Sequence, residues 1–84
     1  MEIYSKIFIF DKVRDKSTGE IIERETRRKG QELIVEILEV GKPLLYSYIS
    51  GGSLYTSTVQ DYQFDDRELV ITTMNSVYTF KLKG

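Results

Sequence analysis

The sequence contains no cysteine, no histidine and no tryptophan, and it has a single proline. Without cysteine, neither a disulfide framework nor a thiolate zinc site can form. Without histidine, the Ser-His-Asp and Cys-His catalytic arrangements and histidine-containing zinc sites are excluded as well. Several enzyme classes are removed at once, so we expect a non-enzymatic protein with no cofactor and no metal site.

Long apolar runs are missing too, and no stretch approaches the roughly 20 apolar residues that a helix needs to span a bilayer. The apolar residues near the start follow an early glutamate and precede no small-residue cleavage pattern, so this segment is interpreted as a strand rather than a signal peptide. We therefore expect a cytoplasmic protein without a membrane partner. The 84 residues fit one small domain, residues 1–84, with a modest core.

A strong excess of either charge is also absent, since the formal net charge is −1. Residues 1–30 contain eight Lys or Arg against six Asp or Glu, and residues 31–84 contain four against seven. A nucleic-acid-binding domain usually shows a strongly basic face. The mild asymmetry therefore gives little support to DNA or RNA as the main partner.

Residues 3–13 are rich in Ile, Phe and Val, and residues 14–20 supply turn formers. This pattern predicts an N-terminal hairpin whose return strand covers residues 21–29. Neither alternating face of that return strand is apolar, so we expect a ribbon that projects into water. A short helix is the alternative, because three correctly oriented i,i+4 ion pairs are available. They are Glu20 with Arg24, Glu23 with Arg27, and Glu25 with Lys29.

Residues 33–40 contain four β-branched residues and favour a strand, with Leu33, Val35 and Ile37 on one face. The alternative is a helix over residues 31–41, because apolar residues also recur at helical spacing and a glycine and a proline follow. Composition does not decide between these two interpretations.

The second half of the chain alternates apolar segments with turn formers. It predicts two further hairpins, the first closed by a Ser-Gly-Gly-Ser connection and the second by Asn75, which tolerates the left-handed conformation. Between these hairpins we expect an acidic loop at residues 61–68. The expected strands are residues 44–49, 54–59, 69–73 and 77–82.

Together these segments predict a mainly β fold, a small antiparallel meander closed into a barrel. Two stretches resemble SH3 domains. Lys-Gly-Gln-Glu-Leu-Ile-Val at residues 29–35 looks like the entry to their second strand, and Gly-Ser-Leu-Tyr-Thr-Ser-Thr-Val at residues 52–59 is similar to their glycine-to-valine segment. The resemblance implies an SH3-like barrel. The motifs of the SH3 peptide groove are absent, so it implies the fold alone.

The only basic cluster of the sequence lies at residues 24–29. Together with a tyrosine from residues 44–49, it could bind phosphates and stack on a base, as small barrels do. The alternative is a solvated hairpin of paired charges, because glutamates interrupt the cluster. Tyrosine is enriched at protein interfaces, although it also fills the cores of small β domains. The candidate binding residues are Arg24, Arg27, Arg28, Lys29, Tyr46 and Tyr48.

A group of carboxylates could in principle hold a hard cation or act as an acid and base pair. Their spacing fits no EF-hand loop, so a solvated turn is the favoured interpretation. An enzyme that used them would need a pocket holding at least two of them. These residues are Asp61, Asp65, Asp66 and Glu68.

These observations favour a non-enzymatic protein-protein interaction module that binds through residues 14–29 or through the face carrying Tyr46 and Tyr48. The small, cysteine-free, tyrosine-rich chain resembles phage or mobile-element accessory proteins that bind a host factor. The alternative function is a nucleic-acid-binding barrel that uses the cluster at residues 24–29. A homo-oligomer is also open, since an exposed strand edge beside the hairpin could pair with a second copy.

Overall fold

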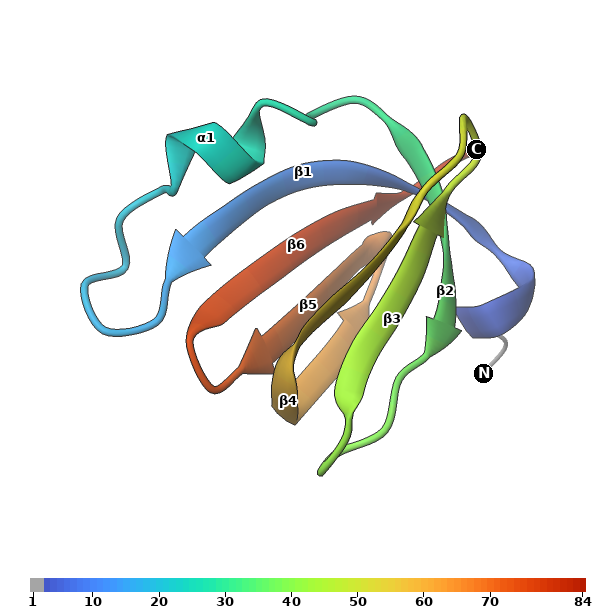
Figure 1. Cartoon of the computed structure of the whole chain (residues 1–84). Coiled ribbons are helices and arrows are strands. Elements are labelled where there is room, and N and C mark those ends of the chain that lie inside the picture. Colours follow the sequence, from blue (N-terminus) through green and yellow to red (C-terminus); the bar gives the residue numbers. More distant parts are fainter. Residues whose placement is uncertain (1–2) are drawn as a thin grey trace.

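The computed structural model describes residues 3–84, and Figure 1 shows its strands curving into a ring with one short helix above it. Most of the chain is strand, as the sequence predicts. The elements are the 3-10 turn η1 (Ile3–Ser5), β1 (Ile7–Asp15), α1 (Glu23–Thr26), β2 (Glu32–Ile37), β3 (Pro43–Tyr48), β4 (Ser53–Asp65), β5 (Glu68–Thr73) and β6 (Ser76–Leu82).

The six strands form an antiparallel meander that closes into a barrel, because β6 pairs with β1. The predicted meander is thus confirmed. The ring is uneven at β1, which pairs with β2 only over Ile7, Phe8 and Ile9 but with β6 from Phe8 to Asp15. The second half of β1 therefore has no strand on one side, and the segment that carries α1 lies there.

The strand interpretation of residues 33–40 is confirmed by β2, and the helix over residues 31–41 does not form. Leu33 and Val35 point into the core, as a two-residue period requires. A bulge between Val35 and Ile37 then shifts the alternation, so that Leu38 is the next buried residue instead of Ile37.

The predicted return strand over residues 21–29 is wrong. Its only ladder contact is an isolated bridge between Arg14 and Ile21, after which the chain turns into α1. The alternative of a short helix is correct, although α1 has only four residues and none of its residues is buried. A strand here would have no apolar face to bury, so nothing would hold it in a ladder.

The predicted acidic loop is also wrong, because β4 continues through Asp65. Tyr62 pairs with Ile71 and Phe64 with Leu69, so aromatic residues between the acids keep the strand in the sheet. The turn follows at Asp66, whose φ of 59° makes it the only non-glycine residue with positive φ among residues 3–84. Asn75 therefore does not adopt the left-handed conformation expected for the last hairpin.

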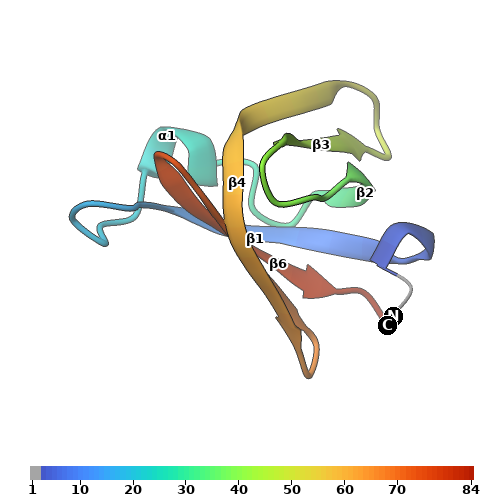
Figure 2. The ribbon, with the colours of Figure 1, turned by 90° about the horizontal axis from the view of Figure 1, so that it is seen from below.

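β4 joins the two sides of the barrel. Its first part pairs with β3 and its second part, from Val59 to Asp65, pairs with β5. Figure 2 shows this long strand passing from the side of β3 to the other side of the barrel. The two halves of β4 thus pair with different strands, so this one long strand connects both sides of the barrel.

The core is filled by inward-facing residues from every strand. A bulge between Phe10 and Lys12 lets Val13 rather than Lys12 follow Phe10 into the core. Aromatic rings form much of this core, with the Tyr46 and Phe80 ring centroids 5.2 Å apart. No helix within residues 3–84 has both the length and the apolar character needed to cross a membrane.

Candidate binding pocket beneath α1

The segment that carries α1 is tied to β1 by backbone hydrogen bonds at both ends. Before the helix, the amide of Ile22 donates to the Val13 carbonyl at 2.8 Å. After it, the amide of Gly30 donates to the Phe10 carbonyl at 2.8 Å, and the amide of Phe10 donates to the Gln31 carbonyl at 2.9 Å. These bonds replace the ladder that β2 does not provide there.

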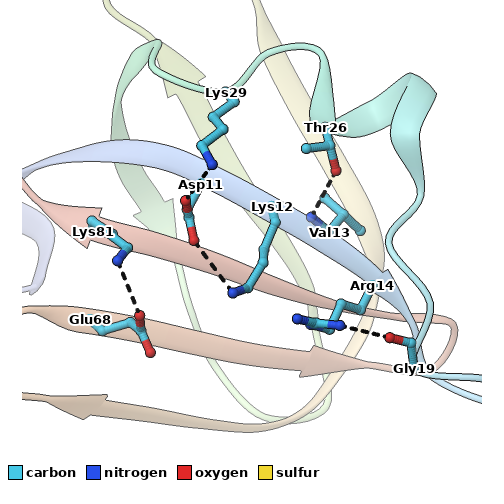
Figure 3. Close-up of polar contacts among 9 residues, drawn as sticks. All are labelled: Asp11, Lys12, Val13, Arg14, Gly19, Thr26, Lys29, Glu68 and Lys81. Carbon is cyan, nitrogen blue, oxygen red and sulfur yellow. Dashed lines mark hydrogen bonds and ion pairs between the residues drawn. The ribbon is translucent and has the colours of Figure 1, made fainter.

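Two side chains of the same segment, those of Thr26 and Lys29, also contact β1, as Figure 3 shows. The Val13 amide donates to Thr26 Oγ1 at 3.3 Å, and Lys29 Nζ lies 3.5 Å from Asp11 Oδ1. Residues 20–31 lie along this side of β1 and bond to it near Val13 and Phe10, so the edge of β1 beside the expected hairpin is covered there. Pairing with a second copy stays a prediction.

A pocket of about 270 Å³ lies between α1 and the barrel. We call it the arginine pocket. Strands β1, β3, β4 and β6 supply its aromatic and apolar lining, and the α1 segment supplies its charges. Its lining residues are Phe10, Val13, Arg24, Glu25, Arg27, Arg28, Tyr46, Tyr48, Leu54 and Tyr78.

Three arginines of this pocket have no carboxylate partner. Within residues 3–84, no ion pair involves Arg24, Arg27 or Arg28, and none of the three expected i,i+4 pairs forms. Helix α1 is too short to align those side chains. The predicted hairpin of paired charges is therefore not what the structure contains. With Glu25 as the only acidic lining residue, the lining carries a net charge of +2.

Arg28 lies against an aromatic ring instead of a carboxylate. Its guanidinium carbon is 5.2 Å from the centroid of the Tyr48 ring, a cation-π contact that contributes about 0.5–1 kcal/mol at an exposed site. The contact leaves the N–H donors of Arg28 available at the mouth of the pocket, since all five lie in the guanidinium plane.

Tyr46 and Tyr48 share one face of β3, as predicted, but that face points into the barrel. Their side chains are only 3% and 5% exposed. They form the floor of the pocket rather than an outward binding face. The exposed tyrosines are instead Tyr4, Tyr55 and Tyr62.

Burial keeps the floor phenols protonated. It is the main cause that raises the pKa of Tyr46 far above its usual range, and it raises the pKa of Tyr78 to about 12. The pKa of Tyr48 is raised as well, although the Tyr46 hydroxyl and the Arg28 guanidinium offset part of the effect. At neutral pH all three phenols therefore remain hydrogen-bond donors.

The Tyr48 hydroxyl is buried beside the Tyr46 hydroxyl, whose proton it can accept, but its own proton has no acceptor at hydrogen-bond distance within the described part of the chain. Leaving such a group unsatisfied costs about 1–3 kcal/mol. Most buried polar groups in native proteins do have a partner. An acceptor supplied by a ligand would remove this cost, so the hydroxyl marks the pocket as a place where something binds.

The structure brings together five of the six candidate residues, and Lys29 is the exception. Lys29 is held by Asp11 and does not line the pocket. Sequence reasoning missed Tyr78, Phe10 and Leu54. Alternation along β6 places Tyr78 inward, but only the closure of β6 against β1 shows that it meets Tyr46.

The carboxylates gather around a second depression, of about 610 Å³, at the turn between β4 and β5. We call it the acidic depression. Its charged lining residues are Asp65, Asp66, Arg67, Glu68 and Lys81, and Asp61 does not take part. Lys81 Nζ is 3.8 Å from Glu68 Oε2, so one carboxylate is already paired. Among residues 3–84, no group of three or more Asp or Glu is placed to hold a metal ion.

No protein-family model, curated protein or solved structure gives a significant match to this chain.

Proposed function

We propose that this protein is a non-enzymatic protein-protein interaction module that holds an acidic segment of its partner at the arginine pocket. The observation that carries the proposal is the set of three arginines, Arg24, Arg27 and Arg28, around a pocket, with no carboxylate of residues 3–84 paired to them. Arginine binds carboxylate groups through two parallel hydrogen bonds, which fixes the orientation of the ligand.

The size of the pocket favours a single side chain of a partner over a free cofactor. Its volume of about 270 Å³ lies just below the roughly 300–1,000 Å³ of typical small-molecule sites. A module of this kind acts by binding its partner. We propose that it is an accessory protein and that the partner is a host factor.

Nucleic-acid binding is the second candidate, because arginines also contact phosphates. Stacking of bases on Tyr46 or Tyr48 has no support, since both rings are buried in the floor of the pocket. The overall charge of −1 also argues against a long phosphate track. We therefore place nucleic acid second.

We also propose that the barrel is of the SH3-like type. Two observations support this assignment: the closed six-stranded meander, and the position of residues 29–35 and 52–59 at the starts of β2 and β4. An experimental structure would test it, and these two segments should superpose on their SH3 counterparts. The function proposed above does not depend on this assignment.

The test is an affinity pull-down from the native host's lysate, with and without nuclease. The test variant is Arg24→Ala/Arg27→Ala/Arg28→Ala. The matched control is Lys42→Ala/Lys81→Ala/Lys83→Ala, which removes the same charge from three exposed lysines outside the pocket. Exposed ion pairs such as theirs contribute less than about 1 kcal/mol each, so the control should fold.

We expect a stoichiometric protein partner that survives nuclease, is retained by the lysine control and is lost by the arginine variant. A Glu-rich peptide should compete for it. Recovery of nucleic acid instead, lost in the arginine variant, would promote the second candidate. Equal loss in both variants would reduce the interaction to general charge attraction and overturn the proposal.

A further inference from the structure

The donors of the arginine pocket exceed what one carboxylate can accept. Three guanidinium groups and the Tyr48 hydroxyl line it. A carboxylate has two oxygens, whereas a phosphomonoester has three strong acceptor oxygens. The pocket is therefore equipped for a larger anion than an Asp or Glu side chain.

The charge of the lining leads to the same conclusion. Three arginines and Glu25 give a net charge of +2. A phosphomonoester carries about −1.5 to −2 at neutral pH, whereas a carboxylate carries −1. The phosphate therefore neutralises the lining more fully than a carboxylate does, even with Glu25 included in the balance.

From these observations we propose that the arginine pocket binds a phosphomonoester group carried by a side chain of the protein partner. The inference rests on the proposed function, which places an acidic segment of a partner protein at this pocket. The Tyr48 hydroxyl donates a hydrogen bond to one phosphate oxygen, and Arg24, Arg27 and Arg28 donate to the others.

Arg28 has a second part in this arrangement, because its guanidinium lies over the Tyr48 ring. The ring holds the cation beside the buried hydroxyl when no ligand is bound. Donors held in place in this way lose less conformational freedom on binding, which favours affinity. The phenol is protonated at neutral pH, as an ordinary tyrosine is, and burial raises its pKa further, so it stays a donor.

The test uses calorimetric titration of the full chain with acetylated, amidated peptides Gly-Gly-X-Gly-Gly at constant ionic strength. X is phosphoserine, phosphotyrosine, tyrosine or glutamate. Adenosine monophosphate serves as a phosphomonoester that is not carried by a protein. We expect a phosphopeptide to bind at least about tenfold more tightly than the glutamate peptide. The two phosphopeptides show which side chain carries the group.

The decisive variant is Tyr48→Phe, which removes the hydroxyl and keeps the ring beneath Arg28. We expect it to weaken phosphopeptide binding about tenfold or more, as loss of a hydrogen bond to a charged group does. Tyr55→Phe is the matched control, because Tyr55 is 69% exposed and does not line the pocket. It should bind as the wild type does.

Three outcomes would overturn the inference. They are equal binding of the glutamate peptide and the phosphopeptides, wild-type affinity in Tyr48→Phe, and tighter binding of adenosine monophosphate than of either phosphopeptide. If the glutamate peptide binds as tightly as the phosphopeptides and its binding is lost in the arginine variant, the proposed function still holds. Failure of every anionic peptide, together with a pull-down unaffected by the arginine variant, would remove both.

Discussion

The arginine pocket and the acidic depression differ in what lies beneath their charges. The arginine pocket has a floor of buried rings, including Phe10, Tyr46 and Tyr78, and its three cations have no carboxylate partner among residues 3–84. The acidic depression is larger, but its acids share the surface with Arg67 and Lys81. Charges that neighbours already neutralise attract a ligand weakly, so the smaller site is the better candidate.

The comparison teaches that the arginine pocket belongs to the core, whereas the depression belongs to the surface. Substitutions should therefore separate the two sites in stability as well as in binding.

Phe10→Ala should lower the free energy of unfolding by about 3–5 kcal/mol, because Phe10 is 2% exposed and its removal leaves a cavity. Val70→Ala, in the acidic depression, should cost less than about 2 kcal/mol because Val70 is only partly buried. Urea unfolding followed by circular dichroism would measure both. Similar losses of unfolding free energy in the two variants would show that the acidic depression belongs to the core as much as the arginine pocket does.

Alkaline pH should destabilise the fold through the aromatic floor. The pKa of Tyr78 is raised from 10.0 to about 12 by burial, so the folded state retains a proton that the unfolded state releases. The stabilisation is complete below about pH 10 and is lost as pH rises to about 12, a change of about 2–3 kcal/mol. Unfolding midpoints across this range would show it.

Tyr78→Phe should reduce that pH dependence by the share of one tyrosine, because the pKa values of Tyr46 and Tyr48 remain raised, and Tyr55→Phe, an exposed control, should leave it unchanged. If Tyr78→Phe loses stability as steeply as the wild type between pH 10 and 12, the floor phenol is not the cause. The acidic depression has no tyrosine in its lining, so we expect it to contribute no loss of stability of this kind at alkaline pH.

The ion pair that holds the α1 segment to β1 should also differ from the one in the acidic depression. Asp11, which contacts Lys29 at 3.5 Å and Lys12 at 3.7 Å, has a side chain only 12% exposed. Asp11→Ala should cost about 1–2 kcal/mol because two lysines lose their partner under the α1 segment. Glu68→Ala should cost at most about 1 kcal/mol, since the Glu68 and Lys81 side chains are both about half exposed. Equal costs in denaturant unfolding would contradict the comparison.

Tyr48→Phe should have the smallest effect on folding. Its hydroxyl is buried and has no acceptor for its proton among residues 3–84, so removing it should leave stability unchanged or raise it by up to about 1 kcal/mol. Thermal unfolding monitored by calorimetry would measure the change. A loss above about 1 kcal/mol would mean that the hydroxyl is satisfied in the free protein, and would take away one reason for placing a ligand there.

Much of the barrel could be predicted because each strand shows a pattern of its own. The apolar alternation at residues 44–49, 69–73 and 77–82 predicts the strands that form. The bulges at Asp11 and near Glu36 could not be predicted, because they depend on how neighbouring strands fit together. They decide that Val13 and Leu38 point inward.

The candidate site was predicted in its residues but not in its arrangement. Arginines and tyrosines are recognisable as binding residues from sequence alone, yet Arg28 and Tyr48 are far apart along the chain. Their contact depends on the segment before β2 folding back over β1. The expected i,i+4 pairs failed because α1 ends after four residues, before they can align.

A mainly β chain without cysteine or histidine chemistry can be predicted from the amino-acid sequence, since composition and two-residue periodicity are local properties. The inward direction of the β3 tyrosines depends instead on how the strands pack, and so does the position of the three arginines above them, which have no carboxylate partner within residues 3–84. Both results follow from barrel closure. Closing the ring gives every strand one inner face, and the short reach of β2 along β1 leaves a gap that the α1 segment covers.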